Sequence, residues 1–256
     1  MSADMEIHEY KDREFPGGTA IIGFPSVGLV SSIASSFIVK NLDLERVAGV
    51  ISPEFPPYTL IHQGVPSPPI RIYAGERMCD ESGEQCDNLV VVTAEFMPKA
   101  DLIKPLADMI LNWLNGKGVQ TIITMEGINS GVDPEEAKTL CVATGDKCAK
   151  MVEQYELESM SEGMVSGMSG VLLYEADRKG LEVMSLLGPA KTNFPDARGA
   201  ARLLEKIGKM FPELDLDPDP LYKEAEQIER QMKNAMESVQ QQEPQKQLSE
   251  SSMIYG

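Results

Sequence analysis

The chain has 256 residues, of which 42% are apolar, enough for one large hydrophobic core or for one core with an appended segment. Its formal net charge of −17 at pH 7 repels phosphate backbones, which argues against general nucleic-acid binding. The acidic balance is compatible with a basic protein partner, but it is more often a means of keeping a protein soluble. The sequence contains no apolar run of about 18 residues or more, so no membrane span is predicted. Residues 1–11 lack the apolar centre of a signal peptide, so we expect a cytoplasmic protein without a membrane partner.

The first half of the chain alternates strand-like apolar runs with helical periodicity. Residues 19–24 form a short apolar run that ends at Gly and Pro, and residues 27–40 follow with apolar side chains at three- to four-residue spacing. Prolines at positions 53, 56 and 57 predict an extended connection. A helix is predicted over 100–115, and the other predicted strands are 46–51, 58–61, 70–73, 89–93 and 120–125.

This β-α-β rhythm predicts an α/β protein with three layers, α/β/α, around a mainly parallel mixed sheet. The segment 126–170 is rich in Gly, Ser and Met and has no assignable period. Beyond it, the pattern predicts a helix at 171–176 with a glycine stop at Gly180, a strand at 181–187, and a last core helix from 195 to 210.

The composition then changes, and we divide the chain into an α/β domain at 1–212, a linker and amphipathic helix at 213–241, and a flexible tail at 242–256. Residues 215–220 are expected to be a linker without core residues. The helix has apolar side chains at alternating spacings of four and three, typical of a coiled coil or of a helix docked on another surface. These positions are Leu221, Ala225, Ile228, Met232, Ala235 and Val239. Residues 240–252 are polar and rich in Gln and Ser, which predicts disorder.

The four cysteines form two pairs, Cys79 with Cys86 and Cys141 with Cys148, each separated by six residues. Zinc ligands are usually closer in sequence, so no metal site is predicted. The first pair flanks the expected tip of a β-hairpin, where a disulfide across the hairpin is one alternative and free buried thiols are the other. The second pair lies in a region that we expect to be partly helical, with the same two alternatives.

The ends of two predicted strands offer a candidate pocket, formed by Gly28, Glu126 and Asn129. The glycine-rich turn 23–28 either cradles an anion at a helix N-terminus or lets the helix sit close to the sheet. It lacks the spacing of a phosphate-binding loop. Glu126 is either an acid or base, or a side chain that satisfies backbone amides in a tight turn. His8 and His62 belong to no recognisable triad, so we predict no catalytic residue, no cofactor and no enzyme activity.

The last three residues, Ile254, Tyr255 and Gly256, form a hydrophobic-Tyr-X (HbYX) ending on a terminal carboxylate. An apolar side chain and a Tyr ring can fill a groove while the carboxylate pairs with a Lys or Arg. A three-residue pattern occurs in many chains by chance. The alternative to a docking motif is an unstructured chain end without a partner. The position at the end of a long polar segment favours binding, because a tether lets a small motif search for its pocket.

Four segments, in this order and spacing, resemble the PAC2 family of proteasome assembly chaperone relatives: 23–30, 54–57, 167–176 and 195–205. The resemblance spans roughly residues 15–211. It implies a three-layer α/β/α fold similar to the phosphorylase/hydrolase-like class, without an established enzyme activity. It also implies a homo-oligomeric chaperone that binds the proteasome core or its α subunits, with Ile254, Tyr255 and Gly256 inserted between α subunits.

We therefore predict a proteasome-binding assembly chaperone that docks through its C-terminus. One alternative is a small-molecule enzyme of the nucleoside phosphorylase or hydrolase type, with its site near Gly28, Glu126 and Asn129. Another is a scaffold that binds a different protein through the helix 221–239.

Overall fold

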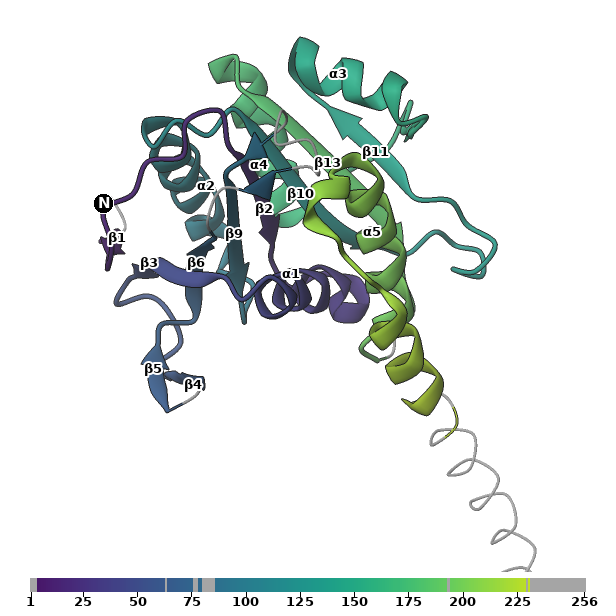
Figure 1. The fold of residues 1–256 in the computed structure, drawn as a ribbon, viewed down its shortest axis with the longest axis horizontal. Coiled ribbons are helices and arrows are strands. Elements are labelled where there is room, and N and C mark those ends of the chain that lie inside the picture. The colour runs from purple at the N-terminus through teal and green to yellow at the C-terminus, as the bar shows by residue number, and fades with distance from the viewer. Residues whose placement is uncertain are drawn as a thin grey trace, which may run out of the picture.

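The computed structural model of the chain describes residues 4–62, 64–75, 78–79, 86–192, 194–228 and 230 (Figure 1). Within these residues a nine-stranded sheet has the order β1-β3-β6-β9-β2-β10-β13-β11-β12. Its strands are β1 (Glu6–Glu9), β2 (Thr19–Gly23), β3 (Glu45–Ile51), β6 (Ile70–Ala74), β9 (Leu89–Ala94), β10 (Thr121–Ile128), β11 (Leu140–Ala143), β12 (Glu158–Ser159) and β13 (Glu182–Pro189).

The four central strands, β9, β2, β10 and β13, run parallel, and so do β11 and β12. The strands β1, β3, β6 and β9 pair antiparallel to one another, and β11 pairs antiparallel to β13. Parallel neighbours need a long crossover, usually a helix, whereas β3, β6 and β9 are connected without one. The predicted mixed sheet is thus confirmed, with its parallel part at the centre.

Helices cover both faces of the sheet and complete the predicted three layers. The helices are α1 (Val30–Asn41), α2 (Ala100–Gly116), α3 (Gly145–Gln154), α4 (Gly167–Lys179) and α5 (Ala197–Met210), with short 3-10 turns η1 (Val27–Leu29) and η2 (Pro212–Leu214). One core forms between the sheet and α2 with α4, and a second between the sheet and α1 with α5 and α3. Successive β9 side chains, such as Val90 and Val91, enter different cores, which explains why that strand is apolar throughout.

Two predicted elements need correction in detail, and one unassigned segment contains regular structure. The helix predicted from residue 27 is interrupted, because Gly28 and Leu29 adopt left-handed backbone conformations before α1 begins at Val30. The segment predicted as a strand at 58–61 contributes β4 (Leu60–His62), which pairs with β5 (Val65–Ser67) in a hairpin of its own, outside the main sheet. The unassigned segment 126–170 contains β11, α3 and β12.

The cysteines lie in two different settings. Strands β7 (Met78–Cys79) and β8 (Cys86–Asp87) form the expected hairpin, with Cys79 directly opposite Cys86 in the register. A disulfide between them stays a prediction. Cys141 in β11 and Cys148 in α3 are buried free thiols, which decides between the two alternatives for that pair. Burial raises the pKa of Cys148 to about 12, so this thiol stays protonated at neutral pH.

The segment after α5 stays on the body rather than leaving it at once. Leu216 packs partly buried against the second core, which corrects the expectation of a linker without core residues. Helical residues 219–228 follow, and their Leu221 and Ala225 are buried. The Tyr222 hydroxyl donates to a carboxylate oxygen of Glu205 in α5 over 2.8 Å. The start of the C-terminal helix is therefore docked on α5. Of its later predicted apolar positions, Ile228 is half-buried, and Met232, Ala235 and Val239 lie outside the described residues.

Candidate functional site

The segment that connects β2 to α1 includes η1 and packs closely against neighbouring backbone. Gly28 has a φ of 62°, and its carbonyl oxygen accepts the backbone N–H of Asp196 over 2.7 Å. A Cβ at Gly28 would lie 2.8 Å from the carbonyl oxygen of Lys191. The residue at this position must therefore combine a left-handed backbone with the absence of a side chain. The geometry favours the close-packing interpretation of the turn over an anion cradle.

Gly127 at the end of β10 meets the same turn from the other side. Its N–H donates to the Ser26 hydroxyl over 3.0 Å, and a Cβ there would lie 2.1 Å from the carbonyl oxygen of Val27. The two backbones can approach this closely only because position 127 has no side chain. The end of β10 and the start of η1 are thus packed directly against each other.

We expect Gly127→Ala to lower the free energy of unfolding by about 1–3 kcal/mol, because the methyl group forces two backbones apart. Gly116→Ala is the matched control, since a Cβ at that helical glycine meets nothing within 4 Å. This control should be as stable as the parent or slightly more stable. Urea unfolding measures the free energy of unfolding of the parent and of both variants. A Gly127→Ala protein as stable as the parent would show that the two backbones can move apart at little cost.

Glu126 lies one residue earlier on β10, with 8% of its surface exposed. Its carboxylate oxygen accepts the Ser169 hydroxyl of α4 over 2.9 Å. Burial raises the pKa of Glu126 to about 7, although the Ser169 hydrogen bond opposes that shift. The expected partner in a tight turn was a backbone amide, whereas the partner in the structure is a side chain of a packed helix. Glu126 is a carboxyl group that can hold a proton near neutral pH.

The structure does not gather the three predicted pocket residues on one side of the sheet. Glu126 points to α4 on one face, whereas Gly28 packs against residues 190–196 leading into α5 on the other face. Asn129 is exposed, and its side-chain oxygen accepts the N–H of Gly131 over 3.1 Å in a local turn. The three residues therefore serve three separate contacts at the carboxyl edge of the sheet.

Two further residues of the recognised segments also have structural partners that sequence reasoning missed. Asp196 is buried and caps α5, accepting the N–H groups of Gly199 and Lys191 over 2.9 Å each. Glu175 of α4 is buried and pairs with Lys104 of α2 and with Arg178, which hold its pKa at about 2. An Asp before a helix is a readable capping signal. The Glu175 network links residues far apart in sequence and has no such local signal.

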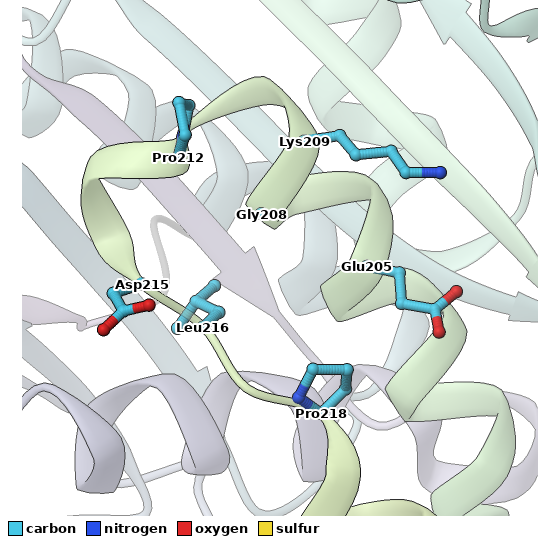
Figure 2. Close-up of a pocket in the computed structure, with 7 residues that line it drawn as sticks. All are labelled: Glu205, Gly208, Lys209, Pro212, Asp215, Leu216 and Pro218. Carbon is cyan, nitrogen blue, oxygen red and sulfur yellow. The ribbon is translucent and has the colours of Figure 1, made fainter.

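A hollow of about 510 Å³ opens between α5 and the segment that follows it (Figure 2). Figure 2 shows Leu216 lying across from Gly208, where α5 has no side chain. The lining residues are Glu205, Gly208, Lys209, Pro212, Asp215, Leu216 and Pro218. The hollow lies where the chain turns after α5 and runs back along it toward the C-terminal helix.

Neither a membrane-spanning helix nor a metal-binding cluster of His, Cys, Asp and Glu occurs in the part of the chain that the structure describes. The residues expected to contact a partner, Ile254, Tyr255 and Gly256, lie outside the described residues. The candidate residues that the structure describes thus make contacts within the fold. The predicted docking element is not among them.

The fold defines a three-layer α/β protein with a mixed sheet, a parallel centre and a docked C-terminal helix. The PAC2 family model matches residues 20–236, so the chain belongs to the PAC2 family. An uncharacterised protein of Methanocaldococcus jannaschii is 30% identical over 242 residues, which cover 93% of each chain.

Two solved structures from Pyrococcus furiosus are similar to this fold. One is PbaA, described as an archaeal homolog of proteasome-assembly chaperone, with a TM-score of 0.81 and 29% identity over 97% of this chain and 99% of that chain. The other is PbaB, described as an archaeal proteasome activator, with a TM-score of 0.77 and 23% identity over 92% of this chain and 100% of that chain. The expected fold and family are therefore confirmed.

Proposed function

We propose that this protein is a cytoplasmic proteasome assembly chaperone or core-binding protein that acts by binding rather than by catalysis. The similarity to PbaA over nearly the whole chain supports this function most directly. The separate structural roles of Gly28, Glu126 and Asn129 also favour binding over a nucleoside phosphorylase or hydrolase activity.

The proposed docking element is the C-terminal Ile254-Tyr255-Gly256, which enters pockets between α subunits of the proteasome ring. Tyr255 fills the pocket with its ring, Ile254 adds apolar area, and the Gly256 carboxylate pairs with a basic residue. The start of the C-terminal helix is docked on the body, since Leu221 and Ala225 are buried and the Tyr222 hydroxyl bonds to Glu205 of α5.

We further propose that several copies of the chain assemble and present several tails to one ring. A single short motif binds weakly, but linked motifs reach a high effective concentration at neighbouring pockets. Self-association therefore converts a weak contact into a useful affinity without any additional contact per copy.

The test is binding of the full-length protein, and of a version ending at Met253, to archaeal proteasome α rings. Loss of binding on truncation supports tail docking. Equal binding by both proteins would move the interface to the α/β domain or to the helix 221–239. Absence of binding by both would favour the alternative of an enzyme, which a screen with nucleoside substrates would then examine.

A further inference from the structure

Two cysteines lie directly opposite each other in the β7–β8 hairpin. Cys79 is the last residue of β7, Cys86 is the first residue of β8, and the antiparallel register pairs them. Residues paired in this way have Cα atoms about 4.5 Å or about 5.5 Å apart, depending on the hydrogen-bond pattern of the pair. Disulfide bonds join Cα atoms that are about 4.4–6.8 Å apart. Both separations fall in this range, so the backbone brings the two cysteines to a distance that a disulfide can bridge.

The hairpin is attached to the centre of the fold rather than to a free loop. It lies between β6 and β9 in the chain, and these two strands are themselves paired, with the buried Ala74 opposite the buried Val90. β7 also lies beside η2, the turn that follows α5. The pairing of Cys79 with Cys86 is thus based on a pair of core strands and has a further element next to it.

The hairpin itself is short and acidic. Each of its strands has two residues, and isolated two-stranded hairpins are marginally stable in water. Residues 80–87 contain four carboxylate side chains and neither Lys nor Arg. Like charges on neighbouring strands repel one another and oppose the pairing. A covalent bond between the strands offsets both effects, because it limits how far the chain can separate when the hairpin opens.

The other two cysteines are unsuited to a bond with either member of this pair. Cys141 is 1% exposed, Cys148 is 0% exposed, and both are free thiols. Burial raises the pKa of both thiols, that of Cys148 to about 12, so their thiolates are scarce at neutral pH. Disulfide exchange proceeds through the thiolate. This leaves Cys79 and Cys86 as the pair for exchange with a disulfide in solution.

We propose that Cys79 and Cys86 form a reversible disulfide bond that closes the β7–β8 hairpin. The oxidant is a small-molecule disulfide of the glutathione class. The two cysteine thiols lose two protons and two electrons as their S–S bond forms, and the S–S bond of the oxidant breaks to give two thiols. The reverse exchange opens the bond in a reducing compartment. Six residues separate the two cysteines, unlike the C-x-x-C spacing of thioredoxin-like catalysts, so the bond stabilises the hairpin rather than oxidising a substrate.

The test uses the full-length protein, equilibrated with oxidised or with reduced glutathione and then treated with iodoacetamide. A protease that cleaves after glutamate separates the two cysteines, because Glu81 and Glu84 lie between them. Mass spectrometry without reductant should find the peptides of Cys79 and Cys86 joined after oxidation and both alkylated after reduction. Cys79→Ser and Cys86→Ser each remove the linkage, whereas Cys141→Ala, the matched control, keeps it.

Amide hydrogen exchange measures what the bond does to the hairpin. We expect the amides of β7 and β8 to exchange at least about tenfold more slowly in the oxidised parent than in the reduced parent, because opening is restricted. Cys79→Ser should show no such difference between the two conditions. Thermal unfolding verifies that each variant is folded.

A folded, oxidised parent in which Cys79 and Cys86 stay free, or in which each carries glutathione, would overturn the inference, since either result means that the two thiols do not meet. Linkage of either cysteine to Cys141 or Cys148 would overturn it as well, as would a bond between two chains, seen as a dimer on a non-reducing gel. Equal exchange rates in the oxidised and reduced parent would show that the bond does not hold the hairpin closed. None of these outcomes depends on binding to the proteasome.

Discussion

Tyr255→Ala is expected to weaken binding to proteasome α rings by about 2 kcal/mol or more per tail, which corresponds to roughly a 30-fold rise in the dissociation constant. The reason is the loss of an aromatic anchor from a pocket, the kind of contact that dominates interface energies. Titration calorimetry with the variant and the parent measures the change. The effect grows further in an oligomer, because every tail loses the same contact.

Tyr255→Phe is the matched variant for this experiment, since it keeps the ring and removes only the hydroxyl. We expect it to retain most of the affinity that Tyr255→Ala loses. The substitutions lie in the C-terminal tail, so the thermal unfolding of both proteins should match the parent. An affinity of Tyr255→Ala equal to that of the parent would show that the tail is not the docking element.

Glu126→Gln is expected to stabilise the protein at pH 8 by up to about 3 kcal/mol, which corresponds to a pKa raised from 4.5 to about 7. The unfolded chain releases the proton near pH 4.5 and the folded protein near pH 7. The folded state therefore binds more protons between these values, and the stability of the parent falls as the pH rises through this window. Gln stays neutral and keeps a carbonyl oxygen that can accept the Ser169 hydroxyl.

Urea unfolding of the parent and of Glu126→Gln at several pH values tests this expectation. The stability difference should be small near pH 4.5, grow up to about pH 7 and then stay constant. Glu162→Gln, at an exposed position before α4, controls for the loss of one negative charge. A Glu126→Gln protein no more stable than the parent at pH 8 would mean that the carboxylate is stabilised in the fold by contacts beyond Ser169.

The strongest sequence signals were the strands buried on both faces. Residues 19–24 and 89–93 were recognised because both of their faces enter a core, which leaves a continuous apolar run. The opposite case is β1, Glu6–Glu9, which pairs along one edge only and is largely exposed, so its composition gave no strand signal. The strand β11 was missed because it is short and lies in a segment rich in Gly, Ser and Met.

The pocket of Gly28, Glu126 and Asn129 was predicted from the ends of strands, and strand ends do meet at one edge of this sheet. Sequence position could not tell which face each side chain would take. Glu126 and its partner Ser169 are separated by 43 residues, and only the packing of α4 on the sheet brings them together. Likewise, the left-handed Leu29 beside Gly28 has no local sequence signal, because this conformation is unfavourable for residues other than glycine.

The most direct test of the central claim is to place a photo-crosslinking phenylalanine derivative at position 255 and irradiate the protein with proteasome α rings. Mass spectrometry then identifies the residues joined to the tail. Tail docking predicts crosslinks to residues on both sides of the junction between neighbouring α subunits, abolished by an excess of an unlabelled peptide ending in Ile-Tyr-Gly. Crosslinks only to the α/β domain of the protein itself, or to α subunits at sites that the peptide does not protect, would contradict the account.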